Sequence, residues 1–128
     1  MKPHYTVALA VAAGFGLGAV AVQGLHAQAT PKAYIVTESE VLDAAVIAET
    51  RPLVAAVVQA AGGRRLVPAG GKIVAIVGEA PKRIGITEYD SLEKAQAYRN
   101  SAAFKELAAK LDKARKSIRV YAVEGAAN

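Results

Sequence analysis

The hydrophobic pattern changes period several times along the chain, and each change marks a predicted element. Residues 33–41 alternate polar and apolar positions and are rich in β-branched and aromatic side chains, which is typical of a half-buried strand. Asp43 occupies a helix N-cap position, and apolar side chains recur at helical spacing over residues 46–60. Gly62-Gly63 follows, as expected at the end of a helix. This part of the chain therefore predicts a strand and then a long helix.

The second half predicts short strands, two helices and a final strand. Three β-rich runs, separated by turn residues, cover residues 64–68, 72–78 and 83–89. Such tight connections favour antiparallel pairing. Asp90 or Ser91 caps the next helix, and Ser101 caps another after a break at Asn100. Residues 117–124 form the last predicted strand.

This order of elements predicts an α+β fold with ferredoxin-like topology, an antiparallel sheet with helices on one face. Both sheet faces carry apolar side chains: Ile84 and Ile86 oppose Tyr89, and Ile118 and Val120 oppose Tyr121 and Val123. Leaving one such face in water costs about 25 cal/mol per Å² of apolar area. A second copy covers it with a single self-complementary surface, so we expect a homodimer formed through the bare face.

The N-terminal segment, residues 1–29, has the three parts of a secretory signal peptide. Lys2 is its one charged side chain, residues 7–22 are almost unbroken apolar, and Ala27-Gln28-Ala29 matches a small-x-small cleavage site. We expect cleavage after Ala29, and residues 30–128 to form one domain. An uncleaved anchor is the alternative, but the run falls short of the roughly 20 apolar residues that span a bilayer. The expected address is bacterial periplasmic or secreted through a Sec-type signal, without stable membrane insertion after cleavage.

Composition removes many kinds of chemistry. The chain has no cysteine, and both histidines, His4 and His26, precede the expected cleavage point. The mature chain therefore lacks thiolate and imidazole nucleophiles, a haem histidine and a His-rich transition-metal site, so no metal or cofactor is expected. Any acid–base step must use carboxylates, lysine or tyrosine. Residues 30–128 carry 15 basic and 11 acidic side chains with interleaved signs, which indicates a solvated surface and no nucleic-acid partner.

A succession of short motifs carries a family resemblance. In chain order these are Lys32-Ala33-Tyr34, Gly62-Gly63-Arg64, Gly70-Gly71, Pro81-Lys82-Arg83, Glu88-Tyr89-Asp90-Ser91 and Tyr98-Arg99-Asn100-Ser101. In order and spacing, residues 32–125 resemble the domain of unknown function 1330 family. The resemblance implies a dimeric α+β barrel, in a superfamily that includes cofactor-free monooxygenases, muconolactone-type isomerases and haem-using proteins. It implies no substrate, because the family's function is not established. Ala80 replaces an aromatic residue often found before the Pro-x-Arg element, and if that aromatic residue lines a pocket in relatives, the pocket of this chain is more open.

Arg83 and Glu88 are the candidate catalytic residues. They begin and end one predicted strand, where a guanidinium can hold an anion and a carboxylate can accept a proton. The alternative is a pair of structural ion-pair partners at the ends of the strand.

Further candidates concern ligand binding. Tyr34, Tyr98 and Tyr121 each combine an apolar ring with a polar tip, which suits a pocket wall, an interface or plain core packing. Ser101 can donate to a ligand or cap a helix, and the cap is favoured. Arg64-Arg65 beside Gly63 invites a phosphate-binding interpretation, but neither a following helix start nor a lysine at P-loop spacing supports it.

Three classes of function remain open. The first is a dimeric binding protein that holds a small acidic or carbonyl ligand between sheet and helices through Arg83 and tyrosine hydroxyls. The second is a cofactor-independent isomerase or monooxygenase with Glu88 as base. The third is a structural or interaction protein without chemistry. Glu88 discriminates between them, because an enzyme needs this carboxyl desolvated with a raised pKa, whereas the other classes leave it exposed or paired.

Overall fold

The computed structural model describes residues 30–127, so the signal segment expected at residues 1–29 lies outside the described residues. The described part contains four strands and three helices, in the order β1 (Ala33–Val41), α2 (Ala44–Ala60), β2 (Arg64–Val67), β3 (Ile84–Tyr89), α3 (Leu92–Asn100), α4 (Ala102–Leu111) and β4 (Arg115–Glu124). None of these helices is long and apolar enough to cross a membrane.

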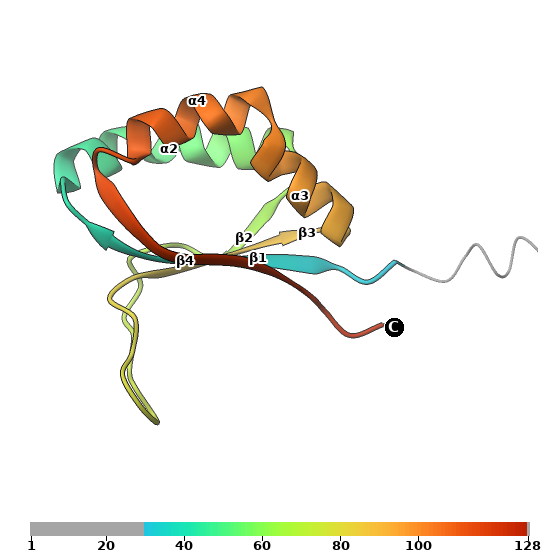
Figure 1. Cartoon of the computed structure of the whole chain (residues 1–128), viewed down its shortest axis with the longest axis horizontal. Coiled ribbons are helices and arrows are strands. Elements are labelled where there is room, and N and C mark those ends of the chain that lie inside the picture. The colour runs from blue at the N-terminus through green and yellow to red at the C-terminus, as the bar shows by residue number, and fades with distance from the viewer. Residues whose placement is uncertain (1–29, 128) are drawn as a thin grey trace, which may run out of the picture. The chain divides into compact units, whose positions relative to one another are not determined.

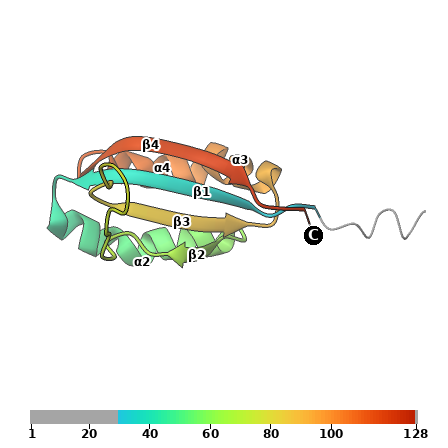
Figure 2. The same ribbon diagram turned by 90° about the horizontal axis from the view of Figure 1, so that it is seen from below.

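The strands form one antiparallel sheet in the order β2-β3-β1-β4. All three described helices lie on the same side of this sheet, and its other side carries none (Figures 1 and 2). The predicted fold class, a ferredoxin-like α+β sheet with helices on one face, is therefore confirmed. Below, the side without helices is called the open face.

Side-chain caps begin the helices where the sequence predicts them. Asp43 accepts hydrogen bonds from the backbone N–H groups of Ala45 and Val46, at 3.0 and 3.2 Å. Ser91 caps α3, and Ser101 caps α4 by accepting from Phe104 N–H at 3.2 Å. Because Ser101 itself has extended backbone angles, α3 and α4 meet there at a break instead of forming one helix.

The core lies between the helices and the sheet. One cluster stacks Tyr89 of β3 on Tyr98 of α3, with ring centroids 5.3 Å apart, and sets Tyr98 edge-on to Phe104 of α4 at 5.1 Å. A second cluster joins α2 to α4 through Ile47, Leu107 and Leu111. These contacts hold α3 and α4 over the middle of the sheet, and they leave a cavity beside the aromatic cluster.

The predicted strand over residues 72–78 is wrong. Residues 68–83 leave the sheet between β2 and β3 and form a long loop, called the arm below, that projects on the open-face side (Figure 1). Its β-branched run has strand propensity, but a strand also needs a neighbouring backbone to receive its hydrogen bonds. β3 pairs with residues 64–67 on one side and with β1 on the other, so residues 72–78 have no place beside it, and within the described chain they pair with neither edge strand, β2 or β4.

The open face is apolar in its middle and ionic toward its ends. Cross-strand register places six large side chains on it, with Val36 buried between its neighbours: Tyr34, Val36, Ile84, Ile86, Tyr121 and Val123. Glu38 accepts from Arg119 at 2.7 Å, and Glu88 is paired with Arg64 at 3.0 Å and with Lys32 at 3.3 Å. The face is thus an apolar strip between two sets of ion pairs.

One predicted facing in β4 is wrong. The sequence places Ile118 with the core residue Val120, but the register between β1 and β4 shifts between Glu38 and Ser39. This bulge changes the alternation, so Ile118 lies beside Glu38 and Arg119 and remains 46% exposed.

Candidate functional site

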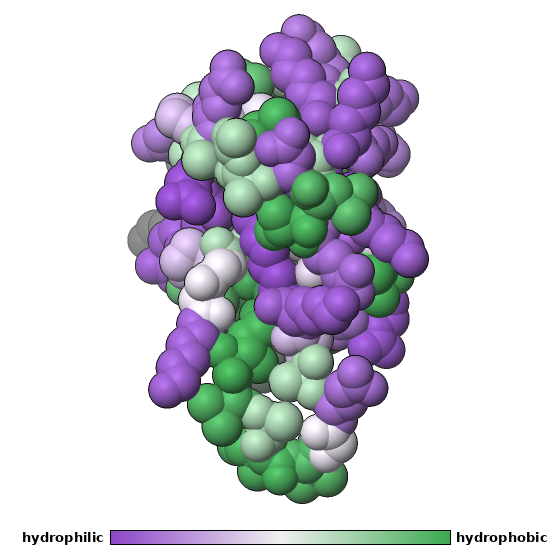
Figure 3. All heavy atoms as spheres, turned by 90° about the vertical axis from the view of Figure 1, so that its left-hand side faces the viewer, coloured by the Kyte–Doolittle hydropathy of each residue, from purple (hydrophilic) through white to green (hydrophobic). Residues whose placement is uncertain are grey.

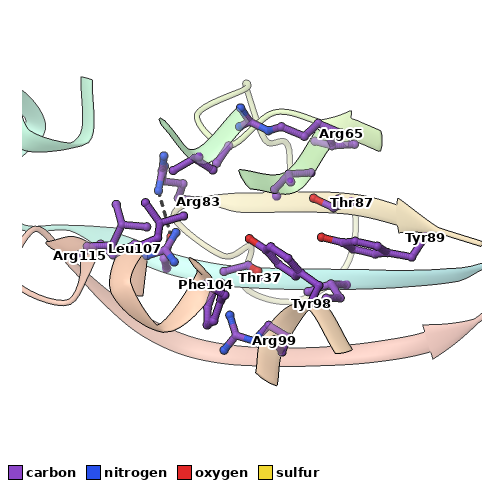
Figure 4. A pocket seen from close by; sticks show the side chains of 18 residues that line it. Thr37, Arg65, Arg83, Thr87, Tyr89, Tyr98, Arg99, Phe104, Leu107 and Arg115 are labelled. Carbon is purple, nitrogen blue, oxygen red and sulfur yellow. Dashed lines mark hydrogen bonds between the residues drawn. The ribbon is translucent and has the colours of Figure 1, made fainter. Parts of the chain in front are cut away.

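A cavity of about 80 Å³ lies between the sheet and the helices (Figure 4). A single water molecule needs roughly 10–15 Å³ of cavity space, so this cavity has room for a ligand of a few heavy atoms. Its apolar wall comes mainly from α2, α4 and the aromatic cluster, including Val54, Phe104 and Leu107. Its polar side chains are Thr37, Ser39, Arg65, Arg83, Thr87, Tyr89, Tyr98, Arg99 and Arg115.

Four arginines reach this cavity from different elements. Arg65 lies on β2 opposite Thr87, and Arg83 directly precedes β3. Arg99 lies in the last turn of α3, with its guanidinium 4.0 Å from the centre of the Phe104 ring. Arg115 is the first residue of β4. The described residues contain seven arginines, and the four half-buried ones are those that line the cavity, whereas Arg51, Arg64 and Arg119 are exposed.

The charges of these four arginines are not matched inside the cavity. No aspartate or glutamate lines it, and within residues 30–127 the ion pairs involve other cations, such as Arg64 and Arg119. Burial lowers the pKa of Arg83, and the charges of Arg51 and Arg65 lower it further. Burial, Arg83 and Arg99 lower the pKa of Arg115, and Asp112 offsets this in part. An arginine stays protonated at ordinary pH, so the cavity concentrates uncompensated positive charge.

Unused hydrogen-bond donors lie beside these charges. Arg83 Nη1 donates to Ser39 Oγ at a long 3.4 Å, and two buried polar atoms find no partner among the described residues: Arg115 Nε and the Tyr89 hydroxyl. Burial raises the pKa of both Tyr89 and Tyr98, which keeps their hydroxyls protonated. The two rings lie side by side with their hydroxyl ends pointing the same way (Figure 4). Buried donors without acceptors are costly, and a bound acceptor would satisfy them.

This arrangement is suited to holding an anion. Guanidinium groups form charge-assisted, often bidentate hydrogen bonds with carboxylate or phosphate oxygens, and tyrosine hydroxyls add neutral donors. The lining contains no carboxylate or histidine that could serve as a general base. Among residues 30–127, no group of three or more histidine, aspartate or glutamate side chains is placed to hold a metal ion.

The structure brings two of the predicted site residues together, because Arg83 and Tyr98 both line the cavity. Tyr34 and Tyr121 lie on the open face of the sheet instead. The hydroxyl of Ser101 donates to Tyr98 O at 2.7 Å and accepts from Phe104 N–H, as expected of the favoured helix cap.

Glu88 lies on the open face, away from the cavity. Side chains alternate along a strand, so Arg83 and Glu88, at an odd and an even position, point to opposite sides of the sheet. Burial alone would raise the pKa of Glu88, but the hydrogen bond from Lys32 and the charge of Arg64 outweigh it and lower the pKa. A lowered pKa with two cationic partners is the behaviour of an ion-pair partner and not of a general base.

Three further arginines line the cavity: Arg99 and Arg115, to which no sequence pattern points, and Arg65, which belongs to the Arg64-Arg65 pattern. The anion-binding interpretation of Arg64-Arg65 was not favoured because P-loop features are absent, yet Arg65 reaches the cavity from a strand. The alternation along residues 83–89 indicates one wall of the cavity from the sequence, because it puts Arg83, Gly85, Thr87 and Tyr89 on the same face of the sheet. No comparable pattern connects Arg99 and Arg115, which are brought near that face only by the packing of α3 and the start of β4.

Fold and site together define a class: a ferredoxin-like α+β protein with a cationic cavity between its sheet and its helices. The chain belongs to a specific family within that fold, because the model of the domain of unknown function 1330 matches residues 32–126. The predicted family resemblance is therefore confirmed. No curated protein matches the chain.

Two solved structures with TM-scores above 0.5 support the fold. A protein of unknown function from Rhodopseudomonas palustris is similar with a TM-score of 0.58 and 16% identity, over 85% of this chain and 93% of that one. A methylated form of the same protein gives 0.57 and 14%, over 84% and 90%. A dimeric ferredoxin-like protein of unknown function from Thermobifida fusca is more distant, with 0.49 and 9%, over 76% and 92%.

Proposed function

We propose that this protein is an exported, homodimeric binding protein for a small organic acid, which it holds in the cavity between sheet and helices. One observation carries the proposal: four half-buried arginines face one cavity that contains no carboxylate. Proteins rarely bury charge without a partner, because desolvation is costly. A ligand carboxylate supplies the missing negative charge, and its oxygens accept from Arg115 Nε and the Tyr89 hydroxyl.

The cavity also favours a particular size and shape of ligand. Its volume of about 80 Å³ suits an acid of a few heavy atoms, and the Tyr98 and Phe104 rings offer an apolar wall to a short carbon skeleton. A second carboxylate or a neighbouring carbonyl oxygen on the ligand would meet further donors, because the arginines approach from β2, β3, α3 and β4. Short monocarboxylates, 2-oxo acids and dicarboxylates are therefore the ligand class.

The enzymatic alternative has less support. It requires Glu88 to act as base on a ligand, but Glu88 lies across the sheet from the cavity and its pKa is lowered by Lys32 and Arg64. The proposed role is accordingly binding, and Glu88 is assigned to the ion pairs of the open face.

Calorimetric titration with matched ligands tests the proposal. The wild-type protein is titrated with acetate, pyruvate and malonate, and with acetamide as the neutral isostere of acetate. The acids should bind and acetamide should not. Arg83→Ala should weaken acid binding by roughly 10- to 100-fold, the value of a charged hydrogen bond. Lys110→Ala, which removes the same charge from an exposed position on α4, should change it less than about twofold. Identical ligand profiles for wild type and Arg83→Ala would reject the anion-holding role.

The homodimer is proposed from the open face. Its strip of large apolar side chains, which includes Ile86, Tyr121 and Val123, is not covered by any helix among residues 30–127. Two-fold pairing buries the strip against itself, with the ion pairs of Glu38 and Glu88 at its ends. Light scattering on the purified protein is expected to give twice the chain mass.

Export is proposed from the segment at residues 1–29. The three-part pattern of Lys2, the apolar run and Ala27-Gln28-Ala29 is that of a cleaved Sec-type signal. Mass spectrometry of the envelope fraction should find a chain that begins at Thr30. Recovery of the full-length chain in the cytoplasm instead would contradict the proposal.

A further inference from the structure

The arm, residues 68–83, carries aliphatic side chains at its apex, residues 74–77, that contact almost nothing. Ile76 and Val77 are each 94% exposed and Val74 is 69% exposed. The space-filling view shows apolar surface gathered at the lower end of the molecule, where the arm ends (Figure 3). Isolated exposed apolar residues are ordinary, but three of them within four positions of a projecting loop form a contiguous patch of the kind that marks an interaction site.

The base of the arm is fixed while its apex stands free. Lys82 pairs with Glu40 of β1 at 3.1 Å, and Pro81 and Lys82 lie in a groove beside Ile118 and Arg119. The arm carries its charged residues on either side of its apex, and the run between Lys72 and Glu79 is apolar. The charged residues are Lys72, Glu79, Lys82 and Arg83. The arm is therefore anchored to the sheet at one end and presents an apolar apex at the other.

The sequence of the apex is that of a buried segment. Residues 73–77 are Ile-Val-Ala-Ile-Val, an uninterrupted β-branched and apolar run that is typical of a strand covered on both sides. Among residues 30–127 no backbone pairs with this segment, and nothing covers Val74, Ile76 or Val77. The mismatch between a buried type of sequence and an exposed position indicates that the cover comes from outside residues 30–127.

Direction and reach identify the cover as a second copy. The arm projects on the side of the sheet that carries no helix (Figure 1), which is the face proposed for pairing. Sheets packed face to face lie about 10 Å apart. A limb of about seven residues extends up to roughly 20 Å at about 3.3 Å per residue, so the arm is long enough to reach the sheet of a second copy.

We propose that the arm is a dimer clasp, and that its apex, Ile76 and Val77, packs against the sheet of a second copy. Two-fold symmetry makes the contact reciprocal, so each copy holds the other with its own arm. The inference rests on the homodimer of the proposed function and is independent of ligand binding in the cavity.

Two aspartates at the apex test the clasp by sedimentation. The protein is purified after expression of the full chain, with and without the double substitution Ile76→Asp and Val77→Asp. The dimer dissociation constant of the variant should rise at least about 100-fold, because two apolar anchors become charges in a buried contact. At a protein concentration low enough for both proteins to be monomeric, the melting curve measured by circular dichroism should be the same for variant and wild type, since the two side chains contact almost nothing in their own copy. Leu42→Asp, at a 63% exposed position before α2, is the control and should leave the dissociation constant within a few-fold of wild type.

A photocrosslink identifies what the apex touches. The chain has no cysteine, so Ile76→Cys labelled with a benzophenone maleimide carries one probe. Illumination should give a covalent dimer whose linked peptide comes from β1 to β4 of the second copy. A wild-type dimer that the aspartates leave intact would overturn the clasp and keep the homodimer, whereas a monomeric wild type would overturn both. Binding of phosphatidylglycerol vesicles that depends on Ile76 and Val77, without a link between copies, would also overturn the clasp in favour of a membrane contact.

Discussion

Replacement of Arg115 by methionine is expected to abolish most small-acid binding and, at the same time, to raise the unfolding temperature of the ligand-free protein. Arg115 is half-buried, its Nε has no partner among the described residues, and Arg83 and Arg99 repel it. Methionine keeps the length of the side chain and removes the charge. Exchanging a poorly satisfied buried charge for an apolar group stabilises a fold by about 1 kcal/mol or more, which corresponds to roughly 4–8 °C for a domain of this size.

The opposite signs of the two effects make this result diagnostic. Loss of one charged hydrogen-bond partner weakens the binding of a ligand roughly 10- to 100-fold. Acid binding should therefore weaken while the unfolding temperature rises. Calorimetric titration and thermal denaturation of the same preparation measure both. The matched control is Arg119→Met, because Arg119 donates to Glu38 at 2.7 Å on the open face and does not line the cavity. It should leave acid binding unchanged and give no gain in stability. A destabilised Arg115→Met protein with normal acid binding would assign Arg115 a structural role.

Gly63→Ala is expected to destabilise the fold by about 2 kcal/mol, within the range of overpacking a dense core. A Cβ on Gly63 would lie 2.8 Å from Val58 Cγ1 and 2.9 Å from Tyr89 Cε1 and Cζ. Both neighbours are buried, at 5% and 1% exposure, so neither can move aside without disturbing the aromatic cluster. The free energy of unfolding by urea titration measures the loss.

Gly85→Ala is the matched control for this experiment. Gly85 lies in β3, and a Cβ there would meet Ala69 Cβ at 3.5 Å, an ordinary contact. We expect a change within about 0.5 kcal/mol of wild type. Equal destabilisation by the two alanines would contradict the assignment of Gly63 to the close approach of Tyr89.

Of the two adjacent glycines, one has a role that the sequence predicts and the other has a role that only tertiary packing shows. Gly62-Gly63 indicates a helix end, and Gly62 indeed has the positive φ of 78° that such an end uses. Gly63 is required for a different reason, since the Tyr89 ring lies where its side chain would be. Local periodicity identifies the first role because it depends on neighbouring residues. The second depends on a residue of β3, and only tertiary structure brings that strand beneath the end of α2.

The site shows the same division. The sequence nominates Arg83, at the start of a strand, and Tyr98, with its apolar ring and polar tip, as pocket residues, and both line the cavity. The pairing of Arg83 with Glu88 was not supported, because alternation along the strand sends them to opposite faces. Arg99 and Arg115 carry no local signal, since a charge at the end of a helix or the start of a strand is ordinary. Their significance comes from sharing one cavity that lacks a carboxylate.

The sequence by itself determines the order of the helices and of the four paired strands, the helix caps at Asp43, Ser91 and Ser101, and the fold class, because period and capping are properties of residues a few positions apart. Tertiary structure decided the rest. It gathered four arginines from separate elements, placed Glu88 on the opposite face, and left residues 72–78 without a strand partner. Facing, burial and pairing depend on contacts between distant residues, and these exist only once the sheet and helices have packed.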